Sequence, residues 1–113
     1  MITARFYCKP SNGSIHMTLK GHAGAATKGE DLVCSAATML AYTVAQAVQF
    51  LNEQGMLKKK PKIHIVDGSA TVIATPTEEG YAPVLHTFWV AQCGIHVLQH
   101  NYPQYVTLEH LKV

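Results

Sequence analysis

Two β-hairpin signals, each followed by a long helical stretch, constrain the fold of this chain more than any other feature of its sequence. Residues 2–8 and 14–20 alternate in character and flank a Ser-Asn-Gly segment, whose residues tolerate the positive φ of a tight turn. Residues 62–66 and 69–75 flank an Asp-Gly pair in the same way. The chain is therefore predicted to form two β-hairpins.

The first helix is predicted to run from about Asp31, a suitable N-cap, to Gln54, with Gly55 just past its end. Apolar residues recur along this stretch at the helical period, which predicts the face that the helix buries. That stripe comprises Leu32, Ala36, Leu40, Val44, Ala47 and Leu51, and it is widened by Met39 and Phe50.

A second helix is predicted to begin near Pro83, because proline suits a first helical turn, and to end near His100 and Asn101. A last strand follows at about residues 104–109. One face of the second helix is apolar and should be buried, with Val84, Phe88, Ala91, Ile95 and Leu98.

The predicted order of elements is ββαββαβ, which indicates an α+β fold. Two helices should pack on one face of a mixed or antiparallel sheet. The 113 residues are expected to form a single domain, residues 1–113. The sequence does not define the order of the strands in the sheet.

Composition excludes several classes of protein. The net charge of +2 is too small to imply nucleic-acid binding by itself. The chain has three cysteines, Cys8, Cys34 and Cys93, and no C-x-x-C motif. An odd number of cysteines cannot pair completely within one chain, which favours free thiols in a reducing compartment. No apolar run approaches the roughly 20 residues of a membrane span, and the N-terminus lacks a signal-peptide core. We expect a soluble cytoplasmic protein without a membrane partner.

The segment from residue 21 to residue 40 carries the candidate chemistry. It places His22 in a glycine-rich stretch and Cys34 twelve residues later. If Asp31 is the N-cap, Cys34 is the third helical residue, close to unpaired first-turn N–H groups. Those groups favour a thiolate and can hold an oxyanion. The commoner role of a free cysteine is that of a small buried hydrophobe.

The other residues of this segment also have two interpretations each. His22 can act as the base that activates the thiol, or it is an ordinary surface histidine. Gly21, Gly24 and Gly29 allow a mobile loop, or they simply fill it. Asp31 can cap the helix and can also orient the imidazole, and the cap needs nothing beyond local geometry.

This segment resembles the ribosomal-processing cysteine protease family, called Prp. The family pattern is G-H-A, a short loop, G-x-D-x-V-C, small residues and then a hydroxyl. The likeness extends to the order of elements and to the total length, but only the segment from histidine to cysteine is specific. The matching residues are Gly21, His22, Ala23, Gly29, Asp31, Val33, Cys34 and Thr38.

The resemblance implies an endopeptidase that removes a short N-terminal extension, after an aromatic residue, from large-subunit ribosomal protein number twenty-seven. It makes Cys34 the nucleophile and His22 the base, and Asp31 matches an acidic position of the family. Thr38 stands where the family commonly has serine, so a hydroxyl is kept one turn from the cysteine. Ser35, a small neighbour of Cys34, leaves room for a peptide. The resemblance also implies a homodimer and a mobile loop between histidine and cysteine.

Two further features point to other chemistry. Lys58, Lys59, Lys60 and Lys62 form a basic run that would suit RNA, although such runs more often form a solvated linker. A non-catalytic ribosome-associated or RNA-binding module is therefore the alternative function.

A metal site is the remaining alternative. His96 and His100 are one helical turn apart, as zinc ligands can be, but no carboxylate completes an H-E-x-x-H pattern and a surface helix face is the commoner explanation. The glycines are not spaced like a phosphate-binding loop. We expect neither a metal nor a cofactor.

Overall fold

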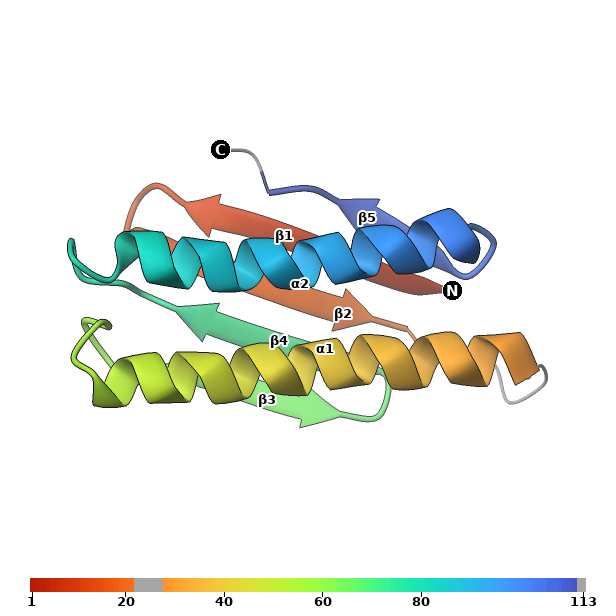
Figure 1. The fold of residues 1–113 in the computed structure, drawn as a ribbon, viewed down its shortest axis with the longest axis horizontal. Coiled ribbons are helices and arrows are strands. Elements are labelled where there is room, and N and C mark those ends of the chain that lie inside the picture. The colour runs from red at the N-terminus through yellow and green to blue at the C-terminus, as the bar shows by residue number, and fades with distance from the viewer. Residues whose placement is uncertain (22–27, 112–113) are drawn as a thin grey trace.

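The structure, a computed structural model, describes the backbone of residues 1–21 and 28–111 and the side chains of residues 1–21 and 32–111. The predicted order ββαββαβ and the α+β class are confirmed (Figure 1). The elements are β1 (Ile2–Lys9), β2 (Ser14–Lys20), α1 (Lys28–Glu53), β3 (Lys62–Val66), β4 (Ser69–Ala74), α2 (Tyr81–Asn101) and β5 (Val106–Glu109).

The five strands form one mixed sheet in the order β3-β4-β2-β1-β5. The neighbours from β3 to β1 are antiparallel, and β1 pairs with β5 in parallel. The junction between β5 and β1 is reinforced where Ile2 N donates to Tyr105 O at 2.8 Å. The sheet thus joins the two predicted hairpins through β2 and β4, with the last strand beside the first.

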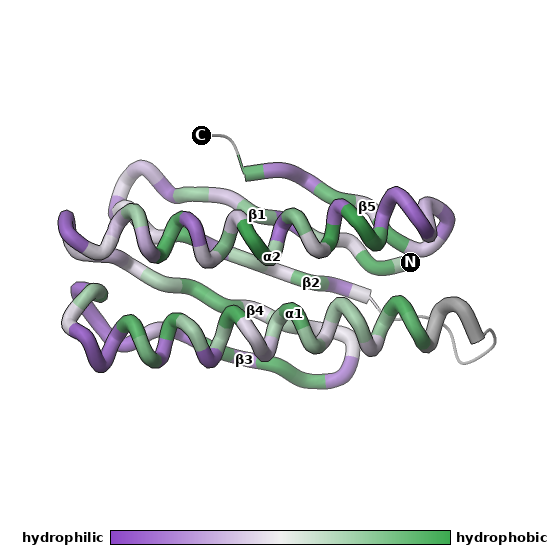
Figure 2. The backbone as a smooth tube through the Cα atoms, in the orientation of Figure 1, coloured by the Kyte–Doolittle hydropathy of each residue, from purple (hydrophilic) through white to green (hydrophobic). Residues whose placement is uncertain are grey.

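The two helices lie side by side, run in opposite directions and cover the same face of the sheet (Figure 1). Because side chains alternate along a strand, every second residue of β1, β2 and β4 points toward the helices and is buried. Figure 2 shows hydrophobic and hydrophilic residues interspersed along both helices. The core between sheet and helices includes Ile2, Phe6, Ile15, Met17, Val72, Phe88 and Ile95.

The start of α1 differs from the prediction. The helix begins at Lys28, so Asp31 belongs to its first turn and is not the residue that caps it. In the sequence, residues 27 and 30 have the T-x-x-E spacing of a capping box, which is a signal for this earlier start. Gly29, predicted to be part of a loop, lies within α1.

The buried face of α1 also differs from the predicted stripe. Leu32, Met39 and Phe50 are 57%, 64% and 54% exposed. Apolar residues occur on more than one side of this helix, so their period alone does not decide which side is buried. Val44 is buried as predicted, and Leu40 and Leu51 pack against the core while partly exposed. Small side chains let the backbone approach the sheet, and the other buried residues of α1 are Val33, Ala37, Ala41, Ala45 and Val48.

The predictions for α2 and the last strand hold more closely. α2 begins at Tyr81, two residues before Pro83, and ends at Asn101 as predicted. Its buried residues include Val84, Phe88, Ala91 and Ile95, and Leu98 packs against the core while partly exposed. β5 is shorter than predicted and starts at Val106.

One expectation about membranes needs correction. The segment Leu32–Glu53 of α1 is long and apolar enough, by length and composition, to cross a membrane. In this fold the inner face of α1 packs on the sheet, and the core helix of a folded domain passes the same test. The finding by itself does not identify a membrane span.

A small polar network is buried on the face of the sheet opposite the helices. Ser14 and His16 are only 2% and 4% exposed. The Ser14 hydroxyl donates its single hydrogen to Asn12 Oδ1 at 2.6 Å, so at 2.8 Å it accepts one from His16 Nε2. The Tyr7 ring stacks on the imidazole with centroids 4.5 Å apart. This network fixes the neutral His16 as the tautomer protonated at Nε2.

The burial of His16 predicts a pH-dependent stability. Burial lowers the pKa of His16 below its ordinary value, and the nearby Lys9 and Lys62 lower it further. Because the unfolded chain takes up the proton at a higher pH than the folded chain does, the free energy of unfolding should fall as pH decreases below about 6.5. Urea denaturation between about pH 7.5 and about pH 5.5 measures this loss.

The variant His16→Gln should lose less stability over that range than the wild type. His64→Gln is the matched control, because His64 is an exposed histidine on β3 of the same sheet. A His16→Gln protein with the pH dependence of the wild type would contradict the assignment.

Candidate active site

Cys34 lines a groove between α1 and the end of the sheet where β2 finishes and the β3–β4 hairpin turns. The groove has a volume of about 200 Å³. The side chain of Cys34 is half-buried and packs at the edge of the core. Cys34 therefore forms part of the wall of the groove and does not lie in the interior of the core. The rest of the lining comes from Ile2, Leu19 and Gly21, from Ala37, Thr38 and Tyr42, and from residues 65–70.

The helical wall of the groove is a stripe with one residue per turn. Cys34, Thr38 and Tyr42 are four residues apart and therefore share one face of α1. The prediction that Thr38 lies one turn from Cys34 on the same face is confirmed. Ser35 is exposed and is not part of this wall, so only its small size bears on access to the groove.

The opposite wall is the turn of the β3–β4 hairpin. Gly21 N donates to Gly68 O at 3.0 Å, which ties the end of β2 to this turn. Asp67 lines the groove and is exposed, and no other acidic residue within the described part of the chain does so. In the sequence Asp67 reads only as a turn residue, because nothing local shows that its turn faces Cys34.

Gly21 occupies a position that accepts only glycine. Its φ is 92°, a conformation that other residues rarely adopt. A Cβ atom at this residue would also collide with the backbone carbonyl oxygen of Met1. The positive φ and the close approach to Met1 constrain the path of the chain as it leaves β2. The prediction that Gly21 contributes to a mobile loop stays a prediction.

Two predicted site residues, His22 and Gly24, lie outside the described residues, and so does the side chain of Asp31. The pairing of Cys34 with His22 accordingly stays a prediction. What the structure supplies is the framework on both sides of this segment: Gly21 at the end of β2, and the first turn of α1 from Lys28.

The helical position of Cys34 changes the electrostatic argument. Cys34 is the seventh residue of α1, not the third. At about 1.5 Å of rise per residue it lies roughly 9 Å along the axis from the first residue. The field of a helix terminus falls off within one turn, so the first-turn N–H groups neither activate this thiol nor reach an oxyanion formed on it. Activation must come from side chains that face the groove.

The remaining predicted features lie away from this groove. The basic run of Lys58, Lys59, Lys60 and Lys62 precedes and begins β3 at the far end of that strand. On α2, the ring of His96 lies near that of His110, with centroids 5.9 Å apart. Among residues with described side chains, no group of three or more His, Cys, Asp or Glu residues is arranged to hold a metal ion.

Comparisons with known proteins agree with this architecture. The family model described as cysteine protease Prp matches residues 1–107. A search of curated proteins found no match. Among solved structures, SMU.848 from Streptococcus mutans is 27% identical, with a TM-score of 0.72 over 99% of this chain and 96% of that chain.

Two structures from S. aureus have the same fold. Both are described as an essential ribosomal processing protease Prp, one in complex with a substrate peptide and one with a covalently linked product peptide. They are 17% and 18% identical to this chain, with TM-scores of 0.68 and 0.67, and each comparison covers 99% of this chain and 100% of the other.

Proposed function

The chain belongs to the cysteine protease Prp family, and from this we propose that it is an endopeptidase that trims a ribosomal protein. The observation that carries the proposal is the position of Cys34, half-buried in the wall of an open groove. The described substrate and product complexes of the S. aureus protein support a peptide ligand for this fold. The substrate we propose is the N-terminal extension of large-subunit ribosomal protein twenty-seven.

The proposed mechanism uses Cys34 as nucleophile and His22 as base. The imidazole takes the thiol proton, and the sulfur then attacks the carbonyl carbon of the scissile bond. The protonated His22 gives its proton to the departing amine, which leaves a thioester that water hydrolyses. We assign Asp31, which matches an acidic position of the family, the role of orienting His22.

The lining of the Cys34 groove supports a peptide substrate that carries an aromatic side chain and a basic side chain. Leu19, Ala37 and Ile65 offer an apolar wall for the aromatic residue at which the family cleaves. Asp67 at the hairpin turn can pair with a basic side chain of the same peptide. The combination fits the N-terminal segment of a basic ribosomal protein.

We also propose that the protein is a cytoplasmic homodimer. The outer surface of the helices exposes several large apolar residues, among them Met39, Phe50, Trp89 and Val90. Apolar surface of this kind is typical of protein interfaces. Light scattering against the chain mass of 12.3 kDa tests the assembly.

The proposed activity is tested by incubating the protein with a synthetic peptide that spans the extension and the first residues of the mature ribosomal protein. Mass spectrometry should find two fragments that meet after an aromatic residue. The matched control is the same peptide with D-amino acids on both sides of the scissile bond, which should stay intact. A wild-type protein that leaves the natural peptide intact would overturn the proposal.

The alternative, a non-catalytic ribosome-associated module, predicts different thiol chemistry. An activated Cys34 should react with iodoacetamide near neutral pH roughly tenfold faster than the other cysteines, because the thiolate is the nucleophile. Cys8 is a useful internal reference, since burial raises the pKa of its thiol. The substitution His22→Ala should slow Cys34 alone. Equally slow labelling of Cys8, Cys34 and Cys93 would favour the binding module.

A further inference from the structure

A second cavity lies at the opposite end of β2 from the Cys34 groove. We call it the lysine cavity. It has a volume of about 110 Å³. Its β2 residues, Ser14 and His16, alternate with the core residues Ile15 and Met17, so the cavity lies on the face of the sheet opposite the helices. Its lining comprises Lys9, Lys59, Lys60, Lys62, Asn12, Ser14, His16, Ile73 and Thr75.

The strand pairing explains why lysines from distant parts of the sequence meet here. Lys9, on β1, is opposite Ser14 on β2. His16 is opposite Ile73, and Ile73 is opposite Lys62 at the start of β3. These side chains all point to the same face, because cross-strand partners share a face of the sheet. Lys59 and Lys60 enter from the segment just before β3.

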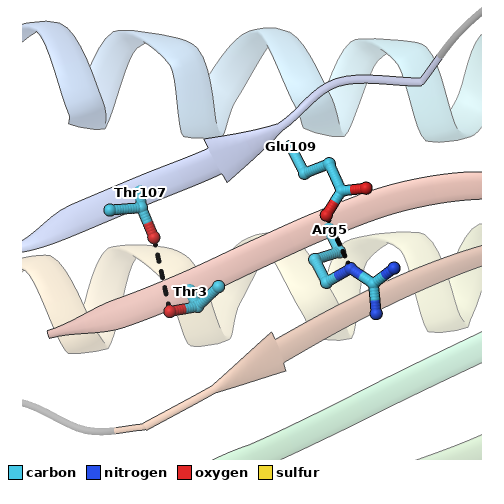
Figure 3. A network of polar contacts seen from close by, with 4 residues as sticks. All are labelled: Thr3, Arg5, Thr107 and Glu109. Atoms are coloured by element: carbon cyan, nitrogen blue, oxygen red, sulfur yellow. Dashed lines mark hydrogen bonds and ion pairs between the residues drawn. The ribbon is translucent and has the colours of Figure 1, made fainter.

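The cavity concentrates positive charge without a counter-charge. No aspartate or glutamate lines it among the residues whose side chains the structure describes. An acidic side chain on the same sheet is already paired elsewhere: Glu109 on the edge strand β5 forms an ion pair with Arg5 on β1 (Figure 3). The distance between Arg5 Nε and Glu109 Oε2 is 2.7 Å. Burial is the main reason for the lowered pKa of His16, and the charges of Lys9 and Lys62 lower that pKa further. An anion in the cavity would relieve this repulsion.

The polar side chains at the floor of the cavity already have hydrogen-bond partners. Ser14, Asn12 and His16 bond to one another, and every buried side-chain nitrogen and oxygen within the described part of the chain has a partner. The ligand contacts therefore fall to the lysine ammonium groups at the rim, which carry three donors each.

We propose that the lysine cavity binds the phosphate backbone of RNA. Lysine is a common point-charge ligand of phosphate, while the fork of an arginine binds carboxylate and phosphate alike. The sole arginine of the chain, Arg5, is paired with Glu109. Ile73 is the only apolar residue of the described lining, so a peptide would find little to anchor it. Polar, positively charged surfaces are typical of nucleic-acid interfaces.

This site is independent of the proposed peptidase activity. Six residue steps along β2 separate Ser14 from Lys20, which corresponds to about 20 Å between the two ends of the strand. The lysine cavity and the Cys34 groove share no lining residue. A protein without measurable cleavage would still bind RNA here.

The test compares two double variants that remove the same charge. Lys9→Gln with Lys62→Gln removes two rim lysines, and Lys20→Gln with Lys58→Gln removes two lysines outside the cavity. Binding of a fluorescein-labelled single-stranded RNA of mixed sequence is measured by anisotropy across a salt series. At about 50 mM salt the cavity variant should bind roughly tenfold more weakly than the wild type, with a salt slope smaller by about 1.4. The control should stay within about threefold of the wild type.

Equal losses in the two double variants would overturn the proposal, because they would indicate diffuse charge without a site. Competition tests the class of ligand. Inorganic phosphate in the millimolar range and poly-glutamate of equal charge should each displace the RNA poorly. Displacement by poly-glutamate at the concentration at which unlabelled RNA competes would assign the cavity to acidic proteins instead. Equal binding of free phosphate would reduce it to a simple anion site.

Discussion

Replacing Cys34 by alanine is expected to abolish cleavage of the extended ribosomal protein, with a loss of rate on the order of 10⁴ or more. Without the sulfur there is no nucleophile and no thioester can form. The fold should survive, because Cys34 is half-buried at the edge of the core and alanine fits a helix well. Cleavage is followed by mass, and the midpoint of thermal unfolding confirms that the variant is folded.

Cys93→Ala is the matched control for this experiment. Cys93 is also half-buried and helical, but it lies on α2 and does not line the groove. It should keep the wild-type rate. His22→Ala should lose activity to a similar degree as Cys34→Ala, because residues that act as a unit are not additive. Undiminished turnover in Cys34→Ala would refute the proposed mechanism.

Replacing Gly21 by alanine is expected to lower both stability and activity. The positive φ alone costs a residue other than glycine about 1–3 kcal/mol. The added Cβ would also collide with the carbonyl oxygen of Met1, so the chain must shift where β2 leaves the sheet. Urea denaturation should show a loss of at least about 2 kcal/mol. The rate per folded molecule should fall as well, since Gly21 lines the Cys34 groove.

The variant Gly13→Ala distinguishes the cost of a positive φ from the cost of the collision with Met1. Gly13 also has a positive φ, 74°, but a Cβ atom there would have no heavy atom within 4 Å. Its substitution should cost only the conformational part and leave cleavage unchanged. If Gly13→Ala and Gly21→Ala lose the same stability and keep the same rate, the contact with Met1 does not hold the groove in shape.

The local parts of the fold were predictable from the sequence. Turn residues between alternating segments identified both hairpins, and the helical period identified both helices. The order of the strands was not predictable, because it depends on pairing between β2 and β4, which are far apart in the chain. The inner face of α1 was predicted only in part: Val44 is buried, but Leu32 and Met39 are exposed. Apolar residues occur on more than one side of this helix, so packing on the sheet decides which of them are buried.

The candidate site shows the same division. Cys34 and Thr38 could be predicted to share a face, since four residues make about one helical turn. The distance of Cys34 from the helix start was wrong, because a plausible cap at Asp31 hid an earlier start at Lys28. Asp67 in the groove and Lys9 in the lysine cavity became candidates only through the sheet, which brings distant turns and strand ends together.

The parallel pairing of β1 with β5 has a consequence for how the protein matures. Arg5 and Glu109 meet across 104 positions of sequence, so β5 can join the sheet beside β1 only after residues 106–109 have been synthesised. Such long-range pairing is slow to form. During synthesis β1 cannot pair with β5 until the residues of β5 have emerged from the ribosome. Ile2, which bonds to Tyr105, also lines the Cys34 groove. The growing chain can therefore complete this groove only after the segment that contains Tyr105 has been made.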